Sequence, residues 1–203
     1  MLRDFSLVEI EDHSGSVYGL WPDLTLAYLS PSWFAFSQQN DGHPAIADDW
    51  GVGRSVLDAI PQVLSEFYAK LYADALTHNP ALRPATHTYE CSSARQFRRF
   101  AMHLYPLRDA AGLLIVNSLL VEAPCDIAAR PPHGPSLEAY QDHTGTIRQC
   151  AHCRRIQRVG EARRWDWVPE WVDTPPAAVS HALCGICLDY YYPEAGPRSV
   201  PAQ

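Results

Sequence analysis

The strongest periodic pattern in the chain lies at residues 62–77, where apolar side chains recur at the three- and four-residue spacing of an amphipathic helix. Pro61 stands immediately before this run, and proline suits the first helical position because its missing amide proton would have no partner there. Asn79–Pro80 follows the run and indicates its end. These residues predict a long helix with one continuous apolar face.

Two short apolar runs precede this helix and predict a pair of strands. They span residues 16–21 and 24–29, and Pro22–Asp23 between them is a turn signal. Alternate residues of the second run are apolar, which places them on one face of a strand. Ser30–Pro31 then predicts the start of a further helix, because serine caps free amides and proline fits the first turn.

Three more strands are predicted after the long helix. They span residues 86–92, 97–107 and 113–121, and a short turn at 109–112 joins the last two. Two long strands joined in this way form an antiparallel hairpin. Strands collected into one antiparallel sheet, with helices on one face, define the α+β class. We therefore expect an α+β domain in the first part of the chain.

Four cysteines in two CxxC pairs carry the clearest chemistry in the sequence. The first pair is Cys150 and Cys153, and the second is Cys184 and Cys187. Two such turns can surround one tetrahedral zinc ion in a closed, structural site. Two disulfides or a redox pair are the alternatives, although a CxxC redox motif normally appears once, beside a βαβ pattern. A structural zinc ion is therefore the expected cofactor.

A proline-rich segment divides the chain. Pro124, Pro131, Pro132 and Pro135 deny residues 124–136 both ladder hydrogen bonds and helical continuity. Zinc would hold together the part that follows, which is too small to fold on a hydrophobic core alone. The predicted division is a sensor-sized domain, a linker, a four-cysteine module and a flexible tail, at residues 1–123, 124–145, 146–194 and 195–203.

The net charge is -7, but it is unevenly distributed. Residues 1–145 hold 9 Lys and Arg against 17 Asp and Glu, whereas residues 146–203 hold 7 against 6. Six arginines form a basic segment that could meet phosphate or acidic partners. They are Arg148, Arg154, Arg155, Arg158, Arg163 and Arg164. Because the body is acidic and four zinc-bound thiolates add negative charge, nucleic-acid binding is the alternative and not the first expectation.

Several classes of protein are disfavoured by what the sequence lacks. It opens without a basic and apolar leader, and none of its apolar stretches approaches the length of a membrane span. A cytoplasmic location without a membrane partner is therefore expected, and reduced thiols there favour metal over disulfides. The sequence contains no HExxH, GxSxG or kinase motif, so we expect no catalytic activity.

The N-terminal region resembles a PAS domain, the small bacterial sensor module. The matching segments are VYGLWPDLTLAYLSPSWFAF, GRSVLDAIP and YECSSARQFRRFAMHLYPLRDAAGLLIVNSLLVE, within residues 8–123. The resemblance implies a PAS-like five-stranded antiparallel sheet, with helices on one face that enclose a pocket. It also implies that the protein receives a small-molecule ligand or a signalling protein partner. A homodimer is a further partner to consider.

The C-terminal region resembles the short cysteine-rich segment that follows PAS or GAF domains in bacterial signalling proteins. The matching segments are CAHCRRIQ, WDWVPEWV and SHALCGICLDYYYPE. The pair Ser180–His181 and the ending Tyr192–Pro193–Glu194 both match that pattern. The loop before Trp165 departs from it, since it is rich in arginine where the segment often has an acidic turn. The preference for a partner therefore stays open.

A PAS-like pocket would be lined by aromatic side chains and one amide, and the alternative for each is ordinary core packing. These residues are Tyr28, Trp33, Phe36, Tyr72, Phe100 and Asn117. His78, near the end of the long helix, and His103, on a strand, raise the less favoured hypothesis of a haem group, because PAS haem sensors use a histidine from the helix side.

The remaining histidines and cysteines near the metal site have weaker signals. His181 could replace a cysteine as a metal ligand, or hydrogen-bond to the shell from outside. His152, inside the first CxxC turn, is expected to face solvent. Cys91 lies in a predicted strand and is expected to be a small buried side chain. Cys125 lies in the linker, where an exposed, oxidisable thiol is one option.

The sequence as a whole predicts a cytoplasmic signalling or regulatory protein that binds a small ligand or a protein partner. In this interpretation the structural zinc module is a rigid docking surface. One alternative is a nucleic-acid-binding regulator that uses the arginine-rich zinc module, recognisable by steep salt dependence. Another is a zinc–thiolate redox switch, in which oxidation of the cysteines ejects the metal.

Overall fold

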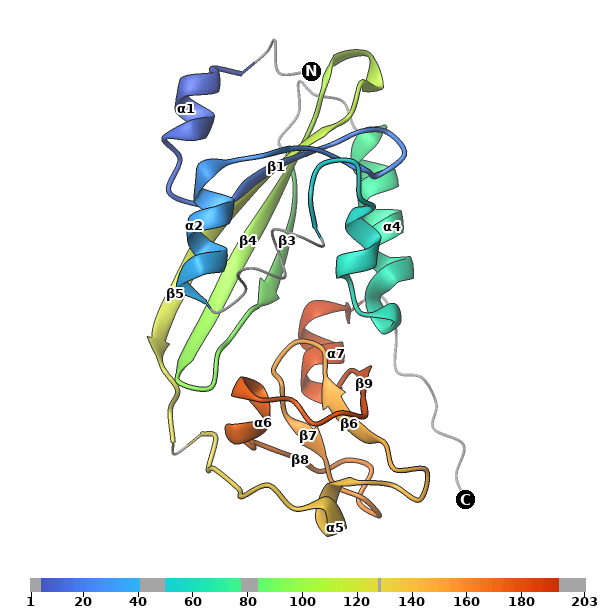
Figure 1. The fold of residues 1–203 in the computed structure, drawn as a ribbon. Helices are drawn as coiled ribbons and strands as arrows, with labels where there is room; N and C mark the ends of the chain where they lie inside the picture. Colours follow the sequence, from blue (N-terminus) through green and yellow to red (C-terminus); the bar gives the residue numbers. More distant parts are fainter. Residues whose placement is uncertain (1–4, 41–49, 78–83, 128, 194–203) are drawn as a thin grey trace. The chain divides into compact units, whose positions relative to one another are not determined.

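The computed structural model describes residues 5–40, 50–77, 84–127 and 129–193 (Figure 1). The chain divides into two compact units. The sheet unit consists of Met1–Thr88 and Phe100–Leu120, and the cysteine unit consists of Tyr89–Arg99 and Val121–Gln203. The end of one hairpin, residues 89–99, therefore belongs to the cysteine unit. The sequence-based division had placed it within the N-terminal domain, residues 1–123.

A five-stranded antiparallel sheet organises the sheet unit and confirms the predicted α+β class. Its strands follow the order β2-β1-β5-β4-β3. They span Val17–Leu20 (β1), Leu26–Leu29 (β2), Ala85–Glu90 (β3), Gln96–Pro106 (β4) and Leu113–Pro124 (β5). β1 pairs antiparallel with both β2 and β5. The hairpin from β4 to β5 turns at a short 3-10 helix, η2, Arg108–Ala110, so all five strands lie where the sequence predicted them.

The helices that follow β2 begin at the residues expected from their sequence. α2 spans Pro31–Gln39, and its cap is Ser30, whose hydroxyl accepts a hydrogen bond from a backbone amide of the first turn. α4 spans Gln62–Leu76, and Pro61 occupies its cap position, one residue before the first helical position predicted for it. The predicted stop at Asn79–Pro80 lies outside the described residues. No helix in the described parts of the chain has both the length and the apolar character needed to cross a membrane.

Side chains from both faces of the sheet are buried. On one face, Tyr18 of β1 packs edge to face on Trp33 of α2, with ring centroids 5.4 Å apart, and shares a 3.2 Å hydrogen bond with Tyr72 of α4. Neighbouring residues on a strand point to opposite faces. The opposite face therefore carries a separate cluster, made of Ile10, Val17, Leu107 and Leu114. Ile10 comes from α1, Leu7–Glu11. This helix, like the 3-10 helix η1 at Val56–Ala59, was not predicted.

The cysteine unit contains a second sheet, in the strand order β8-β7-β6-β9. Its strands are Ile147–Cys150 (β6), Ile156–Gln157 (β7), Trp165–Asp166 (β8) and Val179–Ala182 (β9). Its helices are Leu137–Tyr140 (α5), Glu170–Asp173 (α6) and Gly185–Tyr191 (α7). β6 pairs antiparallel with β7 and parallel with β9.

Two buried clusters hold the cysteine unit together. One is apolar and consists of Tyr140, Ile147, Ile156, Val168 and Trp171. The other contains the four paired cysteines, with Trp165, Leu183 and Tyr191 packed around them. Tyr140 lies in the apolar cluster although the sequence-based division assigned it to the linker. The C-terminal half of that linker therefore contributes to the core.

Gly15 lies where the chain entering β1 meets β5. A Cβ atom at this position would lie 2.0 Å from the carbonyl oxygen of Asn117, far inside van der Waals contact. The amide of Asn117 donates a 2.9 Å hydrogen bond to the carbonyl of Ser16. The atom nearest to such a Cβ belongs to the backbone of β5. It cannot move aside as the end of a flexible side chain could.

We predict that Gly15→Ala destabilises the sheet unit by roughly 1–3 kcal/mol, the usual cost of overpacking. Gly51→Ala is the matched control, since a Cβ at Gly51 meets no atom of the described residues within 4 Å, and it should change stability by less than about 0.5 kcal/mol. Denaturant unfolding of both variants measures the difference. Equal stability of the two variants would show that the approach of these two strands is not fixed by glycine.

Candidate metal centre

Parallel pairing of β6 and β9 brings the two CxxC turns together. In this pairing Cys150, the last residue of β6, lies opposite Ala182, the last residue of β9. Because parallel strands in register end at the same edge of a sheet, both turns leave from that edge. The first turn reverses the chain into β7, with Arg154 in the left-handed region at φ 61°. The second turn opens α7, whose cap is Cys184.

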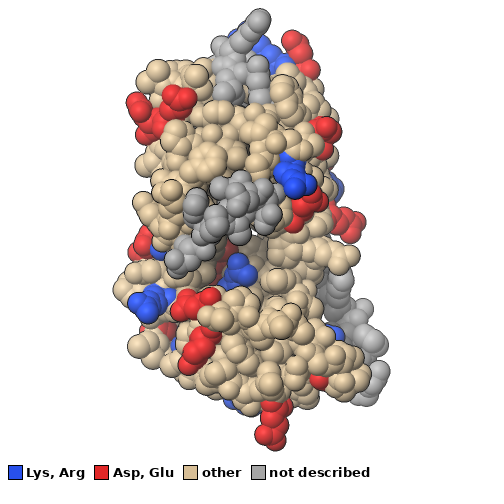
Figure 2. Space-filling view, in the orientation of Figure 1, with Lys and Arg blue, Asp and Glu red and all other residues tan. Residues whose placement is uncertain are grey.

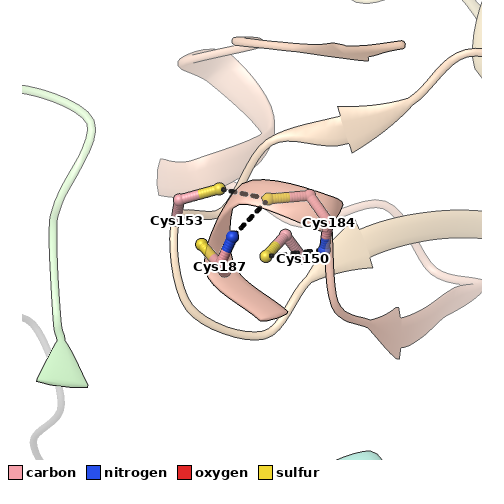
Figure 3. A group of neighbouring side chains, drawn as sticks. All are labelled: Cys150, Cys153, Cys184 and Cys187. Carbon is pink, nitrogen blue, oxygen red and sulfur yellow. Dashed lines mark hydrogen bonds between the residues drawn. The ribbon is translucent and has the colours of Figure 1, made fainter. Parts of the chain in front are cut away.

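The four sulfur atoms form one compact group, shown in Figure 3. All of them lie within 4.8 Å of one another, and Sγ of Cys153 lies 3.7 Å from Sγ of Cys184. A tetrahedral zinc ion with Zn–S bonds of about 2.3 Å separates its sulfur ligands by about 3.8 Å. The four cysteines could therefore hold a metal ion such as zinc.

Hydrogen bonds favour a thiolate at Cys150, against the opposing effect of burial. The four cysteines are buried, with exposed fractions from 0% to 3%. The backbone amide of Cys184 donates to Sγ of Cys150, and that of Cys187 donates to Sγ of Cys184, both at 3.5 Å. Hydrogen bonds from the other three thiols, that of Cys153 foremost, lower the pKa of Cys150 far below its usual value. The negative charge of bound thiolates thus has partners in the backbone.

His152 does not face solvent, so that expectation was wrong. Its exposed fraction is 3%, its Nε2 shares a 2.5 Å hydrogen bond with the hydroxyl of Tyr192, and its ring stacks on Tyr191 at 4.5 Å. Burial lowers the pKa of His152 to about 4, against an opposing effect of Cys150. The neutral ring therefore links the first CxxC turn to the aromatic residues that close the cysteine unit. The run of three tyrosines after the last cysteine was the sequence signal from which aromatic partners of His152 could have been predicted.

The other residues singled out near the site lie outside the group of four sulfurs. His181 is in β9 with its side chain exposed, and the metal-binding group found among the described residues consists of cysteines alone. Cys91 and Cys125 are both free and partly buried. Sγ of Cys125 lies 3.8 Å from the carbonyl of Ser93, to which it donates a weak hydrogen bond. Burial raises the pKa of both thiols, which lowers their reactivity.

Asp166 forms ion pairs with two of the six arginines of the basic segment. Its carboxylate accepts hydrogen bonds from Arg158 at 2.8 Å, from Arg164 at 3.2 Å and from the hydroxyl of Tyr140 at 3.0 Å. Burial alone would raise the pKa of Asp166, but these hydrogen bonds lower it below its ordinary value. On the face drawn in Figure 2, basic and acidic side chains lie beside one another. Charge within the unit is therefore partly compensated.

Arg130 is a structural residue that the sequence did not reveal. It lies in the proline-rich segment, and its guanidinium donates to Glu90 at 2.9 Å. The same group lies over the rings of Phe97, at 5.3 Å, and Trp167, at 5.4 Å. Nearby, Arg99 donates a 2.8 Å hydrogen bond to the hydroxyl of Tyr190. These contacts bind the hairpin end, residues 89–99, to the rest of the cysteine unit. The only sequence signal for this role was that Arg130 stands alone among prolines.

The residues predicted to line a PAS-like pocket do not all share one face of the sheet. Trp33 and Tyr72 meet at Tyr18, and Phe36 packs edge to face on Phe100 at 5.8 Å. Tyr28 packs instead beside the cluster on the opposite face.

Asn117 is buried, and its side-chain amide donates to the backbone oxygen and the hydroxyl of Ser16 at 3.4 and 3.3 Å. Its Nδ2 therefore has partners within the chain.

Two buried polar atoms on α2 lack partners in the part of the chain that the structure describes. They are the indole Nε1 of Trp33 and the hydroxyl of Ser37. Their spacing of four residues places them on one side of the helix. A buried polar group without a hydrogen bond costs about 1–3 kcal/mol. Ser37 had not been singled out from the sequence, because a single serine in a helix carries no distinctive pattern.

The two histidines of the haem hypothesis are not brought together among the described residues. His78 lies outside them. His103 is on β4, where it shares a 3.3 Å hydrogen bond with the hydroxyl of Thr86 at an exposed position. Its place in β4, three residues after Phe100, puts it on the face opposite that ring. Haem binding stays the less favoured, untested hypothesis.

Comparisons with known proteins give limited similarity. No protein-family model and no curated protein matches the chain. Among solved structures, the PAS domain of BvgS from Bordetella pertussis is 15% identical, with a TM-score of 0.33, over 56% of this chain and 77% of that one. A domain of an HTR-like protein from Haloarcula marismortui is 11% identical, with a TM-score of 0.34, over 54% of this chain and all of that one. The fold assignment therefore rests on the sheet itself.

We predict that the purified, reduced protein binds one zinc ion per chain and that Cys184→Ser abolishes this binding. The cysteine unit of the variant should unfold, because its small core depends on the metal, while the sheet unit keeps its structure. Cys125→Ser is the control, and it should retain the metal. Elemental analysis and circular dichroism provide the measurements. Reduced wild-type protein without stoichiometric metal would rule out the site.

Proposed function

We propose that this chain is a cytoplasmic regulatory protein without catalytic activity, in which the sheet unit receives a small ligand and the cysteine unit docks a signalling protein partner. The proposal draws on the five-stranded sheet, the resemblance of its sequence to PAS sensor domains, and the four-cysteine site. A shell of four thiolates leaves no open coordination position for a substrate, so zinc at this site would be structural.

The observation that carries the ligand-binding role is the pair of unpartnered polar groups on α2. Trp33 contacts Tyr18, which in turn contacts Tyr72, so the indole lies among aromatic side chains on the helix-covered face. Pockets for small molecules combine such apolar walls with a few polar groups that fix orientation. A ligand that accepts from the indole and bonds to the hydroxyl of Ser37 would supply both missing hydrogen bonds.

We predict that Ser37→Ala separates ligand binding from folding. In protein freed of small molecules, the substitution should leave stability unchanged or raise it, because it removes a buried hydroxyl that lacks a partner. In protein purified from its native source, it should reduce the amount of co-purified small molecule at least about tenfold, the effect of losing roughly 1.4 kcal/mol.

Native mass spectrometry and calorimetry provide the two measurements. Gln38→Ala, at an exposed position on the same helix, is the control and should retain the wild-type amount of ligand. An absorption spectrum of the same sample tests for haem. Wild-type protein that carries no small molecule, or a variant that retains the full amount, would contradict the ligand-binding role.

The hairpin end supports a link between reception and docking. β3 and β4 belong to the five-stranded sheet, yet the residues that join them belong to the cysteine unit. Arg130 and Tyr190 hold these residues by the ion pair with Glu90 and the hydrogen bond from Arg99. In this proposal, a change in the position of either strand is passed along the backbone to residues 89–99, which are part of the cysteine unit. A sensor domain that has no catalytic activity of its own needs such a connection to a unit that binds the signalling partner.

We predict that removal of zinc with a chelator raises amide hydrogen exchange in residues 89–99 of the wild-type protein. In Arg130→Met, exchange there should already be at least about tenfold faster, because a charged hydrogen bond contributes roughly 1.5–3 kcal/mol. Removal of zinc from the Arg130→Met variant should then raise the exchange rate of residues 89–99 only slightly further.

Arg148→Met is the control for this comparison, since Arg148 is exposed on β6, and it should behave as wild type. If exchange at residues 89–99 responds to neither change, the hairpin end does not depend on the metal-bound unit, and the proposed link is lost.

The nucleic-acid alternative has less support. Arg158 and Arg164 are engaged by Asp166, so part of the basic segment is used within the unit. The redox alternative requires an oxidant to reach cysteines that are almost fully buried. Release of zinc by mild peroxide, reversed by a reductant, would favour it nevertheless.

A further inference from the structure

We propose that the cysteine unit contains a second binding site, for a small planar aromatic molecule that carries a carboxylate or a phosphate. The site is a half-open pocket of about 730 Å³ beside the second CxxC turn. Three segments of the cysteine unit form it: residues 129–133 of the proline-rich segment, residues 155–167, and residues 183–189 at the start of α7. Pockets of 300–1,000 Å³ are typical of small-ligand sites.

Flat apolar surfaces form part of the wall of this pocket. Trp167 is buried, and the guanidinium of Arg130 packs on its ring, which fixes the ring in place. Trp165 is half-buried and packs against the cysteine cluster. Ile186 leaves 70% of its surface exposed although it is apolar. The half-buried indole of Trp165 and the exposed side chain of Ile186 provide the contacts that an aromatic ring would cover.

The charges that remain in the pocket favour an anion. Arg155 and Arg163 both line it, and neither forms an ion pair with any described residue. Their neighbours Arg158 and Arg164 differ in this respect, since both bind Asp166.

Asp166 is paired with Arg158 and Arg164, and Arg130, which also lines the pocket, is paired with Glu90. The two guanidinium groups of Arg155 and Arg163 then stand against the carboxylate of Asp189. Arginine binds carboxylate and phosphate oxygens through two parallel hydrogen bonds. A carboxylate or a phosphate is therefore the expected group on the ligand.

This site is separate from the ligand site proposed on the sheet unit. All of its residues belong to the cysteine unit, and it requires neither Trp33 nor Ser37. Failure of one proposal therefore leaves the other unaffected, and the variants that test them do not overlap.

The test uses the full-length protein with its metal and three probes that share one ring system: 2-naphthoate, 2-naphthyl phosphate and the uncharged 2-naphthamide. Titration calorimetry should show that at least one of the two anions binds, and at least about fivefold more tightly than the amide. The stronger of the two anions identifies the acidic group that the pocket prefers. Equal binding of all three probes, or no binding at millimolar concentration, would overturn the proposal.

Single substitutions then locate the binding. Arg155→Gln and Arg163→Gln should each weaken the anion at least about fivefold, whereas Arg148→Gln, an exposed arginine of the same basic segment outside the pocket, should have no effect. Ile186→Ser, at an exposed position, should weaken all three probes that bind without changing zinc content. If Arg148→Gln weakens the anion as much as the pocket variants do, the attraction comes from the general charge of the segment and the proposed pocket is wrong.

Discussion

The parallel pairing of β6 with β9 is the constraint on which the cysteine unit depends. Each strand is only four residues long, and they are separated by 28 residues of loops, short strands and a helical turn. Their register places both CxxC turns at one edge, so that four buried sulfurs converge. Short strands in a small unit bury too little apolar surface to maintain such non-local pairing alone. A bound ion and the strand pairing would therefore depend on each other: the pairing aligns the ligands, and the ion would keep the strands together.

The same unit shows how charge is distributed around such a site. Asp166 binds two arginines and the hydroxyl of Tyr140, which anchors the arginine-rich loop to the apolar cluster. Arg155, just before β7, and Arg163, in the loop after it, both line the pocket. On the first CxxC turn, burial keeps His152 neutral next to the thiolates.

Much of the fold followed from local patterns, because strands and helices depend on periodicity and caps. β1 to β5, the start of α2 at Ser30 and the span of α4 were all predicted in this way, and the CxxC spacing brought out the four cysteines. α1 was missed because its five residues are too few to show a period. The burial of His152 and the contacts of Arg130 were missed for another reason. Both depend on residues about 40 positions away in the sequence, Tyr192 and Glu90 respectively, and no local pattern encodes such contacts.

The assignment of residues 89–99 to the cysteine unit also affects how the protein is made. Arg99 and Tyr190, which hydrogen-bond to each other, are 91 positions apart in the chain. At a synthesis rate of about 5–20 residues per second, the ribosome adds Tyr190 roughly 5–20 s after Arg99. The cluster of Ile10, Val17, Leu107 and Leu114 contains no residue of that hairpin end. All residues of this cluster are therefore synthesised before the second CxxC turn.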